Sequence, residues 1–281
     1  VSDGYAGVEF SYEIYLNRRA RDIAPIRITG NYGGELLRSI QGILRAGLIS
    51  EDIFNSEIVA HAADAQETLR ELYQSSDNHF SFNLFKEIPW YRNSGLVCEQ
   101  AMVTPRSPYL DNDLVSLMYR APNGVRDDVE VSLRLIADGN QVLGDIPTDR
   151  GIGGNRVFPF AHIASAYGEF TFKAEYAFNY GMPQWLARIN HWMEFAHPER
   201  LFLGRHKFAH FRVWYRDQLA SFVKEILLDE KTLQRGVYNN RKVEEIVQNH
   251  TDGRHNYTNE ISQLLSIELI HRLLVEKTDD Y

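Results

Sequence analysis

The glycine-rich stretch Gly30-Asn-Tyr-Gly-Gly-Glu35 is the part of the sequence whose residue types and spacing best suit chemistry. It lies between a predicted short strand, residues 26–28, and a predicted helix. A helix that begins directly after a glycine-rich loop points unpaired backbone N–H groups, and the positive end of its dipole, at the loop. The pattern therefore predicts a site for phosphate or carboxylate. The alternative is a tight turn that needs glycine only for positive φ angles.

Other groups with chemical potential are more scattered. The loop at residues 144–154 carries Asp149 and Arg150 among four glycines, and we expect it either to close over an anion or to stay solvated. His206 and His210 have the spacing of one helical turn, but Lys207 stands where a metalloprotease would have its glutamate. The sequence therefore predicts no metal site there.

Two further side chains are interpreted as structural. Cys98, the single cysteine, is expected to be a small buried residue rather than a catalytic nucleophile. Glu268 lies on a strongly apolar last helix, where a carboxylate is expected to be buried against a partner such as an arginine.

The elements that position these residues follow from hydrophobic periodicity. The helix after the first loop is predicted from Leu36, Leu37, Ile40, Ile43 and Leu44. Other helices are predicted at residues 9–22, 51–76, 112–121, 213–227, 243–247 and 261–275. The first of them should pack on the strand through its apolar residues Phe10, Ile14 and Tyr15. Asp111 is expected to be the N-cap of the helix that ends before Pro122.

Three segments are less regular. Residues 79–92 are rich in aromatic side chains and are expected to lie in the core. Residues 129–136 alternate like a strand, yet they end at Gly139-Asn140 like a helix, which we favour. Residues 158–215 have weak periodicity and are interpreted as irregular helices, with an inserted hairpin at about 155–210.

Composition limits the class of protein. The chain has 281 residues, 44% of them hydrophobic, and a net charge of -8. It is long enough to bury a sizeable core, and its acidic balance argues against nucleic-acid binding. No apolar run approaches the roughly 20 residues that cross a bilayer, and the single cysteine fits a reducing compartment, so a cytoplasmic location without membrane contact is expected. The first residues suggest a segment cut from a longer protein.

Several motifs, in this order, resemble the C-terminal synthetase domain of the asparagine synthetase family. Ile28-Thr-Gly-Asn-Tyr-Gly-Gly-Glu-Leu36 is similar to that family's glycine-rich second loop, and Arg106-Ser-Pro-Tyr-Leu-Asp111 to its R-x-P-(F/Y)-L-D segment. The motif H-x-x-G-x-x-N is found from His250 to Asn256, and an apolar helix with Leu264-Leu-Ser-Ile-Glu-Leu269 follows it. The resemblance extends in pieces from about Phe10 to Lys277.

This resemblance implies a fold and an activity. The fold is an α/β layer that becomes mostly α: part of a PP-loop synthetase domain, with few parallel strands and a predominantly helical C-terminal half, over residues 1–281. The activity is ATP-dependent amide formation, in which a carboxylate attacks ATP, pyrophosphate leaves, and ammonia displaces AMP from the acyl-adenylate. The implied cofactors and partners are ATP, Mg²⁺, a carboxylate substrate and an upstream glutaminase domain, and a homo-oligomer is possible.

The resemblance also implies roles for single residues. The binding residues are Gly30, Asn31, Gly33 and Gly34, on the pyrophosphate side, and the catalytic residues are Glu35 and Arg150. The sequence departs from the family pattern at Asn31 and Gly34, which replace carboxylates, and the S-G-G-x-D-S loop is not present. Two alternatives therefore stay open: a degenerate synthetase fold kept for binding or scaffolding, and an unrelated helical domain.

Overall fold

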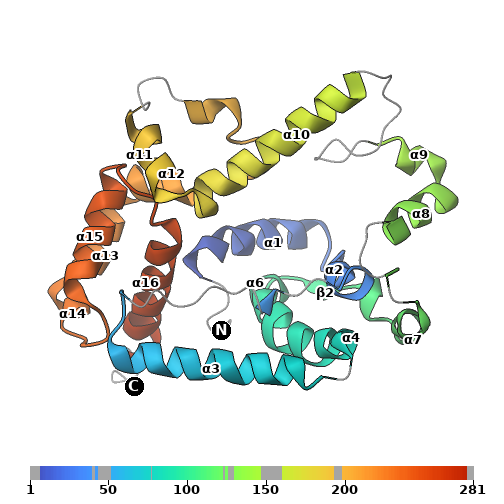
Figure 1. Cartoon of the computed structure of the whole chain (residues 1–281), viewed down its shortest axis with the longest axis horizontal. Coiled ribbons are helices and arrows are strands. Elements are labelled where there is room, and N and C mark those ends of the chain that lie inside the picture. The colour runs from blue at the N-terminus through green and yellow to red at the C-terminus, as the bar shows by residue number, and fades with distance from the viewer. Residues whose placement is uncertain are drawn as a thin grey trace. The chain divides into compact units, whose positions relative to one another are not determined.

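The computed structural model describes residues 7–39, 42–43, 52–76, 78–122, 124–125, 130–146, 160–192 and 198–276. This part of the chain is mostly helical and contains two strands, paired in parallel (Figure 1). That content is compatible with the predicted helix-rich α/β fold. The chain divides into an N-terminal unit, residues 1–51 and 56–139, and a C-terminal unit, residues 52–55 and 140–281. None of the described helices is long and apolar enough to span a bilayer.

The N-terminal unit holds both strands and the glycine-rich loop. Its elements are η1 (Val8–Phe10), α1 (Ser11–Ile23), β1 (Ile26–Ile28), α2 (Gly33–Leu37), α3 (Ser56–Gln74), α4 (His79–Phe82), π-helix η3 (Asn83–Arg92), α5 (Asn93–Gly95), α6 (Val97–Gln100), β2 (Thr104–Arg106), η4 (Pro108–Leu110), α7 (Asn112–Arg120) and α8 (Glu130–Gly139). Helix α8 confirms the prediction of a helix, not a strand, at residues 129–136.

The two strands hold the entry to the glycine-rich loop. Ile26 lies opposite Thr104 and Ile28 opposite Arg106. The backbone N–H of Thr29 donates to the carbonyl of Arg106 at 2.9 Å, one residue beyond the strand. The loop that begins at Gly30 is therefore anchored to the segment that leads into η4.

Helix α1 turns a polar residue toward the strand, and not the apolar residues that were predicted to pack there. Ile14 and Tyr15 are exposed, and the buried residue of the helix is Asn17. The side chain of Asn17 accepts a hydrogen bond from Arg27 of β1 at 2.9 Å. A buried polar group is stable only when it is hydrogen-bonded, so a polar contact, not the apolar stripe, links α1 to the strand.

The core of the N-terminal unit forms under the loop. Leu36, Leu37, Phe80 and Met118 are buried together, and Leu114 and Val115 of α7 pack against them. The aromatic segment is only partly in this core, because Phe85 and Trp90 are exposed. Asp111 caps α7 as expected and accepts hydrogen bonds from the N–H groups of Asp113 and Leu114.

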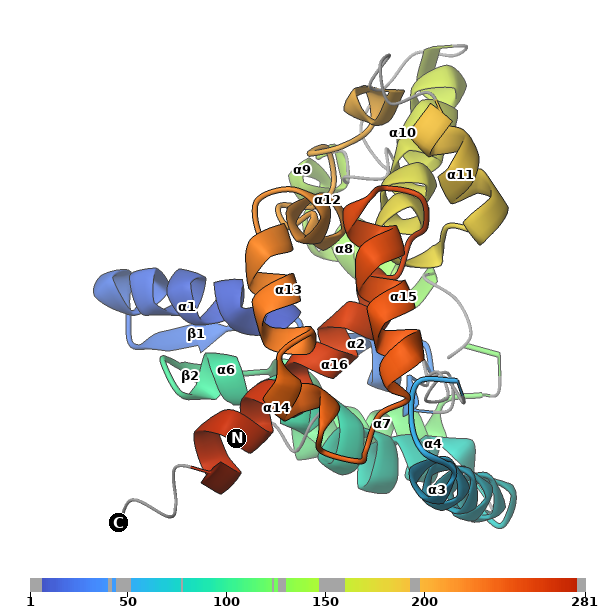
Figure 2. The ribbon, with the colours of Figure 1, turned by 90° about the vertical axis from the view of Figure 1, so that its left-hand side faces the viewer.

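The C-terminal unit is helical in the part that the structure describes. Its elements are α9 (Gln141–Gly144), α10 (Phe160–Tyr176), π-helix η5 (Ala177–Gly181), α11 (Gln184–Trp192), η7 (Pro198–Leu201), α12 (Phe211–Arg216), α13 (Ala220–Leu227), α14 (Glu230–Leu233), α15 (Asn240–Thr251), α16 (Thr258–Ile270) and π-helix η8 (His271–Val275). Helices α13, α15 and α16 lie side by side (Figures 1 and 2). Their buried apolar residues are Val223, Leu227, Val243, Ile246, Val247, Ile261, Leu264 and Leu265.

Two helix predictions in this unit need correction. The helix predicted at residues 213–227 is two helices, because Asp217 leaves the helical conformation with φ -109° and ψ -85°. The segment predicted as irregular begins with the regular helix α10. Two later side chains satisfy the carbonyl of Phe178, which follows α10: Arg212 of α12 and Asn256 of the connection between α15 and α16 donate to it at 3.0 and 3.1 Å.

Candidate functional site

The glycine-rich loop turns at Tyr32, not at a glycine. Tyr32 has φ 71° and ψ -6°, which is the left-handed region, and its carbonyl accepts the N–H of Leu36 at 2.9 Å. A non-glycine residue in this region is strained by about 1 kcal/mol or more. The glycines Gly30 and Gly33 do not have positive φ angles, so the alternative explanation of the loop, glycine for positive φ, is wrong at these positions.

Gly30 and Gly33 differ in what surrounds them. A Cβ atom at Gly33 would lie 2.9 Å from Cε2 of Tyr109, whereas one at Gly30 would meet no atom within 4 Å. Gly33 is therefore required by a close approach of the Tyr109 ring. The loop is covered by an aromatic side chain at Gly33 and is open at Gly30.

The helix after the loop is shorter than predicted. It has five residues, Gly33 to Leu37, and Ser39 beyond it has φ 48°. Ile40 and Leu44, which the periodicity predicts to extend it, lie outside the described residues. A helix of this length has only a small dipole, and within the loop the N–H of Asn31 donates to the Thr29 hydroxyl and that of Gly33 to the carbonyl of Gly30.

Glu35, a predicted catalytic residue, is buried in an ion-pair cluster. Its Oε1 lies 2.6 Å from Nε of Arg92, and Oε1 of Glu87 lies 3.3 Å from the same nitrogen. Glu87 also accepts the backbone N–H groups of Gly42 and Ile43 at 2.8 and 2.9 Å. Two buried carboxylates thus share one guanidinium, which is partly exposed. Sequence reasoning missed Arg92, because the aromatic residues around it were interpreted only as core.

Asn31 is held on three sides. Its backbone N–H donates to the hydroxyl of Thr29 at 3.1 Å, and its carbonyl accepts the hydroxyl of Ser107 at 2.5 Å. Its side-chain amide donates to Oε2 of Glu99 at 3.3 Å. Burial, helped by the charges of Glu35 and Glu99, raises the pKa of the Tyr32 phenol beside it. The loop is therefore ordered and lies in an acidic surrounding.

A magnesium ion does not fit the described residues of this loop. Asn31 and Gly34 offer no carboxylate, and the Glu35 carboxylate is paired with Arg92. Among the residues that the structure describes, no three His, Cys, Asp or Glu side chains are grouped to hold a metal ion. Mg²⁺ prefers carboxylate, phosphate and water oxygens, and this chain's loop supplies too few of them.

The two histidines of the second candidate group lie in an irregular segment, not on a helix, and Gly204 before them has a φ of 78°. The Nε2 atom of His206 lies 2.9 Å from the hydroxyl of Thr171. The Nε2 atom of His210 lies 3.7 Å from the buried carboxylate of Glu175. Burial lowers the pKa of His210, although Glu175 opposes this effect. These contacts hold the segment that carries His206 and His210 against α10.

The other predicted residues are placed as follows. Arg150 and Asp149 lie outside the described residues, so the catalytic role of Arg150 stays a prediction. Cys98 is half-buried, and burial raises the pKa of its thiol, which disfavours the thiolate a nucleophile needs. Arg106 is exposed on β2.

The motif from His250 to Asn256 has a structural role. The Nδ1 atom of buried His250 accepts the N–H of Tyr257 at 2.9 Å, and its Nε2 lies 3.2 Å from the carbonyl of Arg212. Burial lowers the pKa of His250 to about 4. Gly253 has φ 76°, a conformation that glycine adopts without strain. These residues join α15 to α16 and do not form a ligand set.

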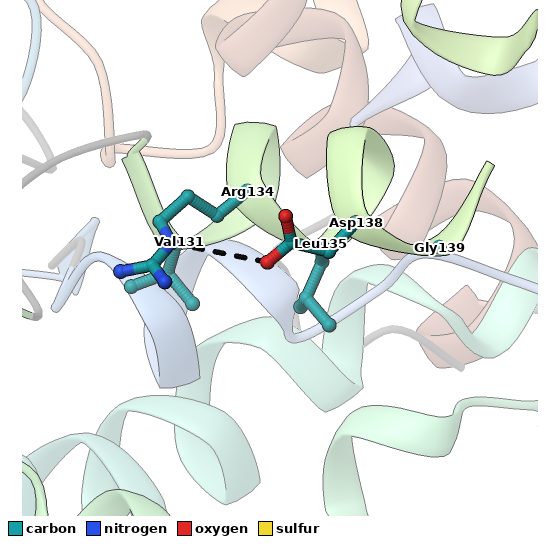
Figure 3. A pocket seen from close by; sticks show the side chains of 5 residues that line it. All are labelled: Val131, Arg134, Leu135, Asp138 and Gly139. Atoms are coloured by element: carbon teal, nitrogen blue, oxygen red, sulfur yellow. Dashed lines mark ion pairs between the residues drawn. The ribbon is translucent and has the colours of Figure 1, made fainter. Parts of the chain in front are cut away.

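A hollow of about 500 Å³ lies along α8, and no residue of the loop lines it. Figure 3 shows its lining: Val131, Arg134, Leu135, Asp138 and Gly139, with an ion pair between Arg134 and Asp138 at 4.0 Å. Since all five residues come from one helix and the two charges are paired, this surface offers little to orient a substrate.

A family model described as asparagine synthase matches residues 197–272. The match confirms, over these residues, the predicted resemblance to the asparagine synthetase family. It includes His250 and Glu268 but not the loop from Gly30 to Glu35. No curated protein and no solved structure matched the chain.

Proposed function

We propose that this chain, whose residues 197–272 match asparagine synthase, is the synthetase part of an enzyme that uses ATP to form an amide from a carboxylate. The match carries the proposal, and it suggests ATP use and ligase chemistry in general. The finer steps, in which an acyl-adenylate forms with loss of pyrophosphate and ammonia then displaces AMP, are part of the proposal. So are a PP-loop fold and a glutaminase domain that supplies the ammonia from glutamine.

The loop from Gly30 to Glu35 is proposed as the pyrophosphate side of the site. Its support is the parallel strand pair, the ordered turn at Tyr32 and the open space at Gly30. Backbone N–H groups near such a turn can bind phosphate oxygens. The partly exposed guanidinium of Arg92 lies at its far side, paired with Glu35, and Arg150 is proposed to face the phosphates.

The proposal assigns no magnesium ligand to this loop. Magnesium would arrive with ATP, bound to its phosphates, as the ion usually is in phosphoryl-transfer and adenylation sites. Within the described residues, the ion pair with Arg92 fixes the Glu35 carboxylate, and the arginine side chain stays partly exposed.

A degenerate synthetase fold that only binds a partner is the second candidate. It is favoured by one observation: the two acidic groups near the loop, Glu35 and Glu99, are both engaged by other side chains. Asn31 and Gly34, which stand where the family pattern has carboxylates, would then be a sign of lost catalysis.

Measurement of pyrophosphate release decides between the two candidate functions, amide synthesis and binding by a degenerate fold. The full-length protein is incubated with ATP, Mg²⁺, ammonia and a panel of carboxylates that includes aspartate, and pyrophosphate is measured by a coupled assay. We expect release that depends on one of the acids. Calorimetry with ATP and Mg²⁺ is run on the same sample. No pyrophosphate with any acid, together with no ATP binding, would favour the degenerate fold.

A further inference from the structure

We propose that Glu99 is the positioning residue of the glycine-rich loop: its carboxylate fixes the Asn31 side chain and, through it, the loop that faces the pyrophosphate. The assignment of pyrophosphate rests on the proposed function, but the contact between Glu99 and Asn31 does not. Nothing in the loop's sequence pattern points to Glu99, which lies 68 residues further along the chain.

The contact belongs to a chain of polar side chains from four segments. Glu99 of α6 is buried, with 5% of its surface exposed. Its Oε2 accepts the side-chain amide of Asn31 at 3.3 Å, and its Oε1 lies 3.3 Å from Nη1 of Arg27 on β1. The same nitrogen of Arg27 donates to Asn17 of α1 at 2.9 Å. The carboxylate thus joins helix α6, the strand and the loop.

The identity of residue 31 follows from this arrangement. An aspartate at position 31 would place a second carboxylate beside Glu99, with Arg27 as the one cation in contact among the described residues. The surroundings are already acidic, because Glu13 of α1 also faces this cluster. Burial and the charge of Glu99 raise the pKa of Glu13, while Arg27 lowers it. An amide is therefore suited to this position, since it donates a hydrogen bond and adds no charge.

The acidic group beside the loop comes from a different element than in the family pattern. The family pattern has a carboxylate in the loop at the position of Asn31, whereas here the carboxylate reaches the loop from α6. The backbone of Asn31 is held separately by Thr29 and Ser107. Loss of Glu99 should therefore release the side chain and the outer part of the loop without breaking its link to β2.

A double-mutant cycle tests the contact. Thermal unfolding is measured for the full chain and for Glu99→Gln, Asn31→Asp and the double variant, at pH 8 and pH 5. We expect Asn31→Asp to lower Tm by about 4 °C at pH 8, because two adjacent carboxylates cannot both stay ionised without cost. The loss should shrink at pH 5, where the pair can share a proton. In the double variant, Asn31→Asp should cost almost nothing further, since the amide introduced at position 99 can donate to the carboxylate introduced at position 31.

A matched control is Asn93→Asp. Asn93 accepts hydrogen bonds from Tyr32 of the same loop and from Gln100, and an aspartate can do the same. We expect this variant to keep its Tm within about 1 °C.

Three charged or titratable groups face Glu99 and affect the pH dependence of these measurements: Arg27, Glu13 and Tyr32. Additive losses in the cycle at both pH values would overturn the proposal.

Binding of inorganic pyrophosphate, measured by calorimetry, separates this inference from the proposed function. If both hold, Glu99→Gln binds pyrophosphate about tenfold more weakly, a loss of the size found when residues that orient metal ligands are removed. If the wild type does not bind pyrophosphate while the cycle shows coupling, the proposed function fails and Glu99 remains the residue that positions the loop. Coupling with unchanged pyrophosphate affinity in Glu99→Gln overturns its role in binding.

Discussion

The guanidinium of Arg235 forms a two-point ion pair with the fully buried carboxylate of Glu268, with N–O distances of 2.6 and 2.8 Å. Arg272 adds a third contact, at 2.7 Å, to the same carboxylate. Burial acts to raise the pKa of Glu268, but the hydrogen bonds from Arg235 and Arg272 outweigh it, and the pKa is lowered. The cluster ties α16 to the segment that follows α14.

Glu268→Gln should strongly destabilise the C-terminal unit. The variant loses the charge-assisted hydrogen bonds to Glu268, while Arg235 keeps its contact with Glu276 and Arg272 its contact with Asp229, so the loss should be about 2 kcal/mol. Urea unfolding measures the loss. Glu245→Gln is the control, because Glu245 pairs with Lys242 at 3.2 Å on the surface, where a pair contributes at most about 1 kcal/mol. Equal losses of unfolding free energy in Glu268→Gln and Glu245→Gln would contradict the expectation that the buried ion pair contributes more than the surface pair.

The stability of the protein should fall on acidification because of His250. Its pKa is lowered from 6.5 to about 4 in the folded state, so the unfolded chain binds the proton more readily. The contribution is therefore complete above about pH 6.5 and is lost as the pH falls towards 4, by roughly 3 kcal/mol in all. His250→Gln should flatten the slope of the unfolding free energy between pH 6.5 and 4. An unchanged slope would show that His250 is not buried as a neutral imidazole.

Alanine at Gly33 and at Gly30 should have different effects. A Cβ at Gly33 would lie 2.9 Å from the ring of Tyr109, which must then shift, and overpacking of this kind costs about 1 kcal/mol or more. At Gly30 there is open space and no positive φ, so Gly30→Ala should be close to neutral. Differential scanning calorimetry measures both. Recovery of Tm in Gly33→Ala combined with Tyr109→Leu would confirm the cause, and no recovery would exclude it.

Local patterns predicted several elements correctly. The strand at residues 26–28, the N-cap at Asp111 and the apolar helix that carries Glu268 are all found where periodicity and capping residues placed them. Each depends on neighbours in the sequence. The expected arginine partner of Glu268 is also confirmed, because a buried carboxylate leaves few alternatives.

The contacts of the candidate loop could not be predicted in the same way. The partners of Glu35 and Asn31 are Arg92 and Glu99, which are more than 50 residues away and belong to no pattern with the loop. The turn residue was also unexpected: Tyr32 takes the left-handed conformation although three glycines are nearby. Its backbone is fixed by tertiary contacts on both sides, and these override local preference.

Arg92→Leu should make the N-terminal unit sensitive to rising pH. In the wild type, Arg92 lies against two buried carboxylates, Glu35 and Glu87. Without the cation, the folded variant must bury negative charge or bind protons, and the unfolded chain need do neither. It therefore binds more protons when folded than when unfolded at mildly acidic pH, so its stability falls as the pH rises from about 4 to 7. At pH 7 the loss should be about 3 kcal/mol.

Urea unfolding of Arg92→Leu at pH 4, 5.5 and 7 tests this expectation, with Arg38→Leu, an exposed arginine just beyond α2, as the control. The Arg38 variant should follow the wild type at each pH. Glu87→Gln combined with Arg92→Leu should restore part of the loss at pH 7, because one of the two buried charges is then absent. A pH-independent loss in Arg92→Leu would mean that Arg92 acts through its packing on Tyr91, whose ring lies 5.3 Å from the guanidinium, and not through the two carboxylates.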